Sequence, residues 1–195
     1  MNKYNPHIHH RRSIRLKGYD YAQAGLYFIT ICCQNRMCRF GNIENGEMIL
    51  NDAGTMILKW YNELENKFPD IKCDVMIVMP NHFHCIVENI GADLRVCPVN
   101  ETNPISNGDE NPISNGDVLG EHIGSPLHRV VQWFKTMTTN DYIRGVKNLG
   151  WQPFDGKLWQ RNYYEHIIRD EKSYNNISNY IINNPLNWRE DKFYE

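Results

Sequence analysis

The stretch MIVMPNHFHCIVE, residues 76–88, joins two apolar runs through a short Pro-Asn connection, and the topology of the chain follows from this junction. The runs IKCDVMIVMP (71–80) and HFHCIVENI (82–90) are typical of β-strands, and their close spacing predicts a β-hairpin. Antiparallel strands can be joined by so short a connection, whereas parallel strands need a long crossover. A sheet built throughout from parallel strands is therefore disfavoured.

The segments on either side of this hairpin alternate between strand and helix patterns. AGLYFITICCQ (24–34) and KLWQRNYYEHII (157–168) predict strands. Three segments predict helices, namely residues 51–70 with a cap at Asn51 or Asp52, residues 125–145 with Ser125 as cap and Gly145 at the end, and residues 169–185 ended by Pro185. The order βαββαβα predicts an α+β fold of the ferredoxin-like, split βαβ kind, in which helices cover one face of an antiparallel sheet and a C-terminal helix follows.

The length of 195 residues, of which 41% are hydrophobic, predicts one domain that spans residues 1–195. Residues 91–122 do not fit the strand and helix pattern, and they contain NPISNGD twice, at 103–109 and at 111–117. Their composition is too polar to bury a core, so we expect a flexible tandem-repeat insertion on the surface.

The chain offers no apolar run of the roughly 20 residues that cross a bilayer, and its first 18 residues lack the apolar stretch of a signal peptide. We therefore expect a cytoplasmic protein without a membrane partner. The six cysteines show no CxxC spacing, and most lie in apolar, strand-like segments where a thiol behaves as a small hydrophobic group. Neither a zinc site nor a disulfide framework is expected.

Charge is distributed unevenly along the chain, whose formal net charge is -2. Residues 1–19 hold five of the 21 Lys and Arg residues and none of the 23 Asp and Glu residues. Such a basic arm can bind phosphate groups by neutralising charge and releasing counterions. A solvated terminus without a ligand is equally compatible with the pattern.

The two histidines of the opening stretch, His82 and His84, are separated by one residue. Residues i and i+2 of a strand point to the same face, so both imidazoles would face one point, as half of a metal site does. A pair of histidines hydrogen-bonded at a strand edge is the alternative. The spacing alone is weak evidence, because the basic arm repeats it at His7 and His9.

The last predicted helix carries Tyr180 and Asn184, four residues apart. The two side chains share a face if the helix reaches that far. A tyrosine hydroxyl can attack phosphorus while a divalent ion polarises the phosphate, and Asn184 could supply an oxygen ligand to that ion. Two alternatives stay open: Tyr180 can pack in the core, and Asn184, which precedes Pro185, can cap the helix.

Several ordered motifs together resemble the REP-associated tyrosine transposases, a branch of the single-tyrosine HUH transposases. They are MPNHFH (79–84), YIINNP (180–185), LWQRNYYEHIIRD (158–170) and RRSIRLKGYDYAQAGLYFITICCQNR (11–36). The resemblance covers residues 11–188 apart from the insertion. It implies a ferredoxin-like HUH domain that binds hairpin-forming single-stranded DNA and nicks it with Mg²⁺ or Mn²⁺. The product would be a 5′-phosphotyrosine link and a free 3′-hydroxyl.

The resemblance also implies roles for individual residues. His82 and His84 match the metal ligands, Tyr180 matches the nucleophile, and Asn184 matches a polar residue that completes the metal site. The basic arm and two later segments become candidates for DNA contacts, through Arg11, Arg12, Arg15, Lys17, Arg129, Lys135 and Arg161.

Alternatives remain at the level of function. A domesticated protein that binds hairpin DNA with little or no cleavage would keep the same motifs. A small metal hydrolase that transfers nucleotidyl groups through histidine is a third class, which the absence of a further alternating histidine weakens. Tyr163 and Tyr164 compete with Tyr180 as nucleophile, and one sequence leaves open whether the protein is a monomer or a homodimer.

Overall fold

The computed structural model describes residues 20–91 and 126–194. The predictions for the basic arm, including those for Arg11, Arg12, Arg15 and Lys17, lie outside the described residues, as do those for residues 92–122 and for Ser125 as a cap. None of the helices in the described part is long and apolar enough to cross a membrane.

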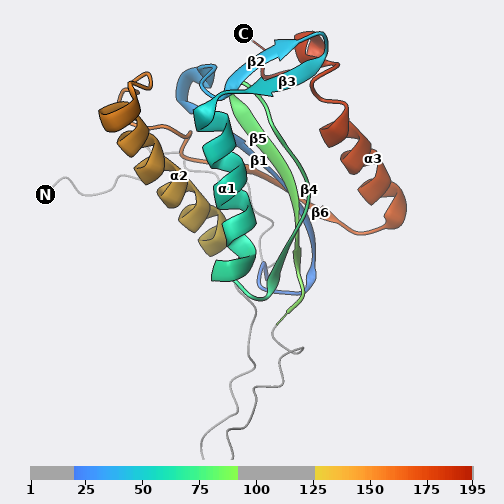
Figure 1. The fold of residues 1–195 in the computed structure, drawn as a ribbon. Helices are drawn as coiled ribbons and strands as arrows, with labels where there is room; N and C mark the ends of the chain where they lie inside the picture. The colour runs from blue at the N-terminus through green and yellow to red at the C-terminus, as the bar shows by residue number, and fades with distance from the viewer. Residues whose placement is uncertain (1–19, 92–125, 195) are drawn as a thin grey trace, which may run out of the picture.

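A four-stranded antiparallel sheet, with strand order β4-β5-β1-β6, forms the centre of the molecule (Figure 1). The strands are β1 (Gly25–Cys32), β4 (Ile71–Val78), β5 (His82–Asn89) and β6 (Tyr164–Ile168). The hairpin predicted from the opening stretch is confirmed, since β4 and β5 pair antiparallel across a connection of three residues. On the other side of β5, Thr30 of β1 lies opposite His84.

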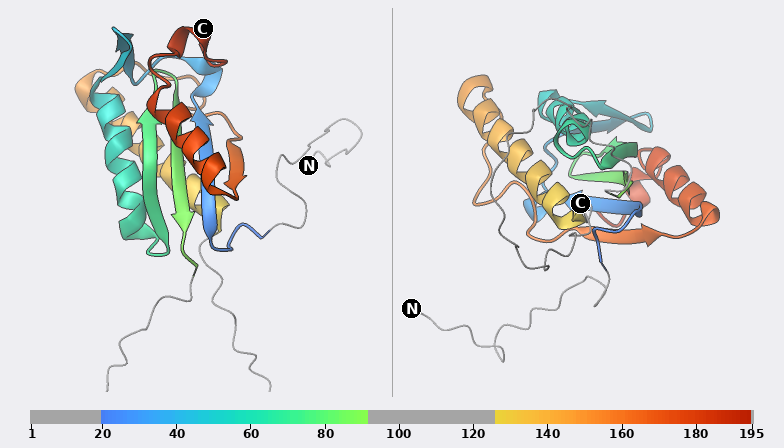
Figure 2. Two further views of the ribbon diagram at one scale, coloured as in Figure 1. Left: turned by 90° about the vertical axis from the view of Figure 1, so that its right-hand side faces the viewer. Right: turned by 90° about the horizontal axis from the view of Figure 1, so that it is seen from below.

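Helices cover both faces of this sheet. Helices α1 (Asp52–Lys67) and α2 (Leu127–Leu149) pack side by side on one face, and α3 (Glu171–Ile182) lies across the other (Figure 2). The α+β fold class with a C-terminal helix that carries the tyrosine is thus confirmed. Asn51 caps α1, because its side-chain oxygen accepts a hydrogen bond from the backbone N–H of Gly54. Asn51 is one of the two residues that the sequence predicted as the cap.

The alternation of side chains along β5 separates the core from the histidines. Phe83 and Cys85 point toward α1 and α2, where they join the main hydrophobic core with residues such as Phe134. His82 and His84 point the opposite way, toward α3 and the C-terminal residues. The core therefore fixes the strand that presents both imidazoles.

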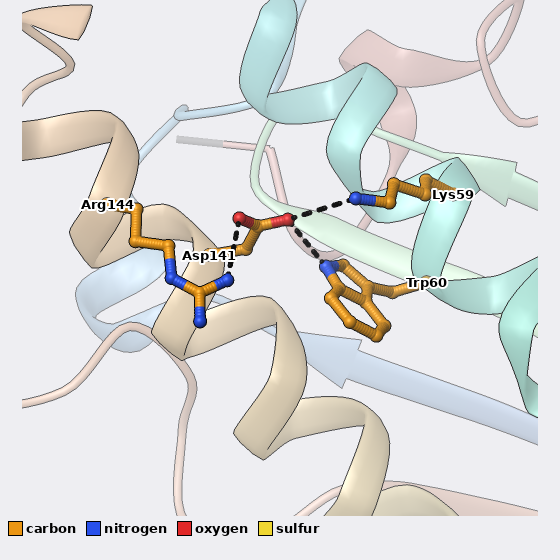
Figure 3. Close-up of polar contacts among 4 residues, drawn as sticks. All are labelled: Lys59, Trp60, Asp141 and Arg144. Carbon is orange, nitrogen blue, oxygen red and sulfur yellow. Dashed lines mark hydrogen bonds and ion pairs between the residues drawn. The ribbon is translucent and has the colours of Figure 1, made fainter. Parts of the chain in front are cut away.

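Asp141 of α2 forms a part-buried hydrogen bond and an ion pair with α1, and a second ion pair within α2 (Figure 3). The indole Nε1 of Trp60 donates to Asp141 Oδ2 over 2.8 Å. Lys59 Nζ lies 3.7 Å from the same oxygen, and an Arg144 guanidinium nitrogen lies 3.6 Å from Asp141 Oδ1. Because the Lys59 and Arg144 side chains are mostly exposed, we attribute the link mainly to the Trp60 hydrogen bond.

The prediction that the second helix ends at Gly145 is wrong, because α2 continues to Leu149. Its C-cap is Gly150, whose φ of 70° is the left-handed conformation that glycine adopts readily. Gly145 is needed for packing instead, since a Cβ atom there would overlap the ring of Trp151. Gly145, which the pattern assigned to a helix end, instead allows α2 and the loop that carries Trp151 to pack closely together.

The prediction of a strand over residues 157–168 is correct only for its second half. Residues 157–163 are irregular and meet the chain at the end of β1 through an isolated bridge between Cys33 and Trp159. The indole of Trp159 donates instead to Thr138 of α2 over 2.9 Å, in a buried position. This anchor to a helix explains why an apolar, aromatic segment does not join the sheet.

A small hairpin was not predicted. Strands β2 (Gly41–Glu44) and β3 (Glu47–Leu50) pair across Asn45 and Gly46, whose φ values are 52° and 80°. An Asn-Gly pair between short apolar runs is a strong hairpin signal, so the sequence did contain the information. Two short 3-10 helices, Gln34–Arg36 and Trp188–Glu190, complete the described structure.

Candidate active site

The two histidines of β5 are buried side by side at one end of the sheet. Their ring centroids are 4.5 Å apart, and each is at most 1% exposed. The Nδ1 atom of His82 lies 2.8 Å from Asn81 Oδ1, and that of His84 lies 2.8 Å from the hydroxyl of Thr30. Both rings are thus oriented through Nδ1, which leaves their Nε2 atoms to face the site.

The tautomer of His82 follows from its neighbour. The amide nitrogen of Asn81 donates to the carbonyls of Arg36 and Phe193, so its oxygen faces His82 and accepts a hydrogen bond. The proton of neutral His82 therefore sits on Nδ1. Its Nε2 atom is buried and has no hydrogen-bond partner among the described residues. A buried lone pair of this kind fits a metal ligand.

Burial keeps both imidazoles neutral near pH 7. It lowers the pKa of His82 to about 4, although the negative charge of Asp191 opposes the shift. The pKa of His84 is well below its usual range, because of burial and of the adjacent His82. Neutral imidazole is the form that binds metal ions, so the environment suits ligands.

Helix α3 carries Tyr180 to the same point. The Tyr180 hydroxyl lies 3.3 Å from His84 Nε2 and donates to Asp191 Oδ2 over 3.2 Å. The ring packs edge-on against Phe28, with centroids 6.1 Å apart, and the residue is 40% exposed. Burial, followed by the charge of Asp191, raises the pKa of Tyr180 to about 12. At neutral pH the phenol is therefore protonated.

The position of Asn184 differs from the helical one that the spacing of four residues suggests. Helix α3 ends at Ile182, before Pro185, and Asn184 lies in the following turn. Its side chain is nevertheless buried at the site, where its nitrogen donates to Asp191 Oδ2 over 2.9 Å. Its Oδ1 atom is buried and finds no partner in the part of the chain that the structure describes. This oxygen is free to bind a cation.

Asp191 is a site residue that the sequence reasoning missed. It follows the 3-10 helix Trp188–Glu190, and ligand atoms of His82, His84 and Asp191 all lie within 4.8 Å of one another. Two imidazole nitrogens and a carboxylate oxygen are donors that a divalent ion accepts. With the unpaired oxygen of Asn184 beside them, these residues fit a metal site. The available signal was the acidic NWRED segment soon after the tyrosine helix.

The last described residues cover the imidazoles. The ring centroid of Phe193 lies 4.6 Å from that of His82 and 6.0 Å from that of His84. The ring centroid of Trp188 lies 5.9 Å from that of His82. The carbonyl of Phe193 accepts a hydrogen bond of 2.8 Å from Asn81. These contacts hold residues 188–193 against β5 and keep the two histidines out of bulk water.

The competing tyrosines lie differently. Tyr164 is 54% exposed, and its ring lies 6.4 Å from Phe193 and under the ammonium group of Lys192. Tyr163 packs partly against the main core. Among the described residues, Tyr180 is the tyrosine whose hydroxyl reaches the histidine pair.

The predicted DNA contacts are spread over other surfaces. Arg129 lies exposed on α2, on the sheet face opposite the histidines, and Arg161 is exposed in the irregular segment before β6. Lys135 is half-buried, and its ammonium group donates to the carbonyls of Gln160 over 2.6 Å and of Arg161 over 3.1 Å. Burial lowers the pKa of Lys135 to about 8. Lys135 thus holds the segment that carries Arg161.

The chain is similar to two proteins of Haemophilus influenzae and to a protein of known structure. No family model matches the chain. An uncharacterized protein of Haemophilus influenzae is 43% identical over 196 residues, which cover 98% of this chain and 97% of that protein. A second Haemophilus influenzae protein, named "Putative REP-associated tyrosine transposase", is 22% identical over 86% of this chain and 73% of its own length.

A solved structure of a REP-associated tyrosine transposase bound to a REP hairpin has the same fold. It covers 93% of this chain and 77% of its own, with a TM-score of 0.51 and 19% identity. In this chain an antiparallel sheet presents paired histidines to a helix that carries a tyrosine. In sequence and in fold the chain is similar to the REP-associated tyrosine transposases, and it shares a family with the 43% identical Haemophilus influenzae protein.

Proposed function

We propose that this protein cuts and rejoins single-stranded, hairpin-forming DNA through a covalent bond between Tyr180 and a 5′-phosphate. The observation that carries the proposal is the position of the Tyr180 hydroxyl, within 3.3 Å of both His84 Nε2 and Asp191 Oδ2. Similarity in sequence and fold to REP-associated tyrosine transposases supports it, and so does the REP hairpin that is bound to the relative of known structure.

The chain's own residues supply most of the chemistry. The oxygen of Tyr180 attacks the phosphorus, and the bond from phosphorus to the 3′-oxygen breaks. Asp191, which already accepts the phenol's hydrogen bond, takes its proton, and the leaving 3′-oxygen takes a proton from water. A 5′-phosphotyrosine and a free 3′-hydroxyl result. In rejoining, a 3′-hydroxyl attacks the phosphotyrosine and loses its proton to water, the bond from phosphorus to the Tyr180 oxygen breaks, and Asp191 returns the proton to Tyr180.

We further propose that His82, His84 and Asp191 hold Mg²⁺ or Mn²⁺, with Asn184 as a fourth protein ligand. The buried, unpaired atoms His82 Nε2 and Asn184 Oδ1 support this set. The bound ion would supply positive charge that polarises the scissile phosphate and stabilises the phenolate. The pKa of about 12 for Tyr180 in the protein alone supports the need for such a charge.

The DNA contacts remain proposals. Arg129 and Arg161 are exposed and free to approach a phosphate backbone, whereas Lys135 would act by holding the segment of Arg161. We propose that Arg11, Arg12, Arg15 and Lys17 grip the foot of the hairpin. If the double substitution Arg12→Ala and Arg15→Ala leaves hairpin affinity and its salt dependence unchanged, the arm has no such role.

Covalent capture of DNA tests the proposal directly. Hairpin oligonucleotides from the repeats that flank the gene would be incubated with the protein and Mn²⁺ or Mg²⁺, and analysed by denaturing electrophoresis. We expect a shifted band that needs metal, disappears in Tyr180→Phe and persists in Tyr164→Phe. Hairpin binding without any covalent band, in either metal, would favour a domesticated DNA-binding protein. A band that persists in Tyr180→Phe would contradict the assignment of the nucleophile.

A further inference from the structure

A pocket of about 680 Å³ lies beside the histidine pair, between the β2–β3 hairpin and residues 185–190. None of the residues that line it is a proposed metal ligand or the proposed nucleophile. Its volume falls within the range of roughly 300–1,000 Å³ that is common for small-molecule sites in proteins. Its lining is mixed, with two aromatic rings, several side-chain amides, one guanidinium group and one carboxylate, that of Glu190.

One residue connects this pocket to the active site. Trp188 lines the pocket, and its ring lies 5.9 Å from that of His82. Pro80, two residues before His82, also lines it. A DNA strand whose phosphate lies at the histidines therefore has its neighbouring nucleotide next to the pocket.

The lining offers the contacts that an unpaired base uses. Tyr194 is 48% exposed and meets Trp188 edge-on, with centroids 5.3 Å apart. The side-chain nitrogen of Asn187 donates a hydrogen bond to the carbonyl of Asn183, and the side-chain oxygen of Asn187 remains available as an acceptor. The guanidinium group of Arg189 has no side-chain partner among the residues that the structure describes. Aromatic rings stack on bases, and amide and guanidinium groups read base edges.

The wall formed by the hairpin is held in place. Gly46, at the hairpin tip, packs so closely on Leu186 that a Cβ atom there would lie 2.6 Å from Leu186 Cδ2. Its φ of 80° also requires glycine. The tip and the segment after α3 thus border a half-open space that is present before a ligand binds, which lowers the entropic cost of binding.

We propose that this pocket receives the unpaired base of a nucleotide next to the cleaved phosphodiester. The pocket would then select where the strand is cut, by stacking on Tyr194 and by polar contacts from Asn187 and Arg189. This inference rests on the proposed function, because it requires the scissile phosphate to lie at His82 and His84.

The test is a set of binding measurements in the Tyr180→Phe background, where the strand stays intact. The cleaved bond is first mapped with the unaltered protein. Hairpin oligonucleotides then carry one abasic site at each nucleotide on either side of that bond. Each oligonucleotide is titrated against the background protein and against versions that add Tyr194→Ala, Tyr194→Phe, Arg189→Ala or, as a matched control for charge, Arg169→Ala.

We expect one abasic position to weaken binding at least about fivefold, because stacking of a base on an aromatic ring contributes roughly 1 kcal/mol or more. Tyr194→Ala should weaken binding of the oligonucleotide that has all its bases, and the abasic site should then cause no further loss of affinity. Tyr194→Phe keeps the aromatic ring, so the abasic site should still weaken binding. Arg189→Ala should reduce affinity more than Arg169→Ala does. Additive effects of Tyr194→Ala and every abasic site would overturn the pocket assignment alone. Failure of the unaltered protein to bind or cut any hairpin would overturn the pocket and the proposed function together.

Discussion

The carboxylate of Asp191 accepts a hydrogen bond of 3.2 Å from the hydroxyl of Tyr180, although eleven residues separate them in the chain. The same oxygen accepts from Asn184, and the other carboxylate oxygen accepts from the backbone of Phe193 over 2.7 Å. Asp191 therefore connects the proposed nucleophile, a proposed metal ligand and the covering segment.

The first prediction concerns Asp191 itself. Asp191→Asn keeps the size of the side chain but removes its charge, so Mn²⁺ affinity measured by calorimetry should fall at least about tenfold, since one charged ligand is lost. The covalent DNA band should weaken as well, while hairpin affinity measured without metal is retained. Asp155→Asn, at an exposed position, serves as the control. Unchanged Mn²⁺ affinity in Asp191→Asn would exclude the carboxylate as a ligand.

The second prediction concerns the stabilising effect of metal. A ligand that binds the folded state alone adds about 2.7 kcal/mol to the free energy of unfolding at 100 times its dissociation constant. Mn²⁺ should therefore raise the melting temperature, EDTA should reverse the rise, and His82→Gln should abolish it. Because two of the donors are imidazoles, Mn²⁺ should bind more tightly than Mg²⁺. An equal rise in His82→Gln would place the metal elsewhere.

The third prediction concerns acid stability of the metal-free protein. The pKa values of His82 and His84 are lowered in the folded state, so below about pH 6.5 the unfolded chain binds protons that the folded protein does not. The free energy of unfolding should thus decrease as pH falls from 7 toward 5, by up to about 2 kcal/mol for each buried histidine. Urea titrations in EDTA measure this.

Two variants separate this effect from general acid sensitivity. His84→Gln removes one of the buried imidazoles, so its stability should depend less on pH between 7 and 5 than that of the unaltered protein. His166→Gln changes an exposed histidine and should keep the full slope. The explanation fails if both variants have the slope of the unaltered protein.

The fourth prediction concerns the link between α1 and α2 in Figure 3. Asp141→Ala leaves the indole nitrogen of Trp60 without its partner, so the free energy of unfolding should fall by about 1–3 kcal/mol. Lys59→Ala removes an ion pair at a side chain that is 63% exposed and should cost at most about 1 kcal/mol. Urea denaturation compares the two. If Lys59→Ala costs as much as Asp141→Ala, the ion pair rather than the Trp60 hydrogen bond makes the link.

Local sequence signals predicted the parts of the site that depend on one element. The period of two along β5 places His82 and His84 on one face, and the motif around Tyr180 places it on a helix. Both positions are found in the structure. The β2–β3 hairpin was not predicted, although the pair Asn45 and Gly46 is typical of a hairpin turn. The strands on either side are only four residues long, so their pattern is weak.

Other features depend on contacts that no local pattern contains. Gly145 resembles a helix end until Trp151 is seen to pack against it. Asp191 reaches the histidines because the chain turns back after Ile182, and periodicity within α3 cannot predict that return. The irregular course of residues 157–163 likewise follows from the bond between Trp159 and Thr138.

The position of α3 has a further consequence for the whole site. Tyr180, Asn184 and Asp191 all lie on the C-terminal segment, which meets the sheet through a small apolar cluster around Ile181 and Ile86. The sheet contributes the two imidazoles, and the C-terminal segment contributes the phenol and the oxygen donors. Displacing this segment would remove the nucleophile and dismantle the cation site in one movement, so the two cannot be lost separately by a shift of the backbone.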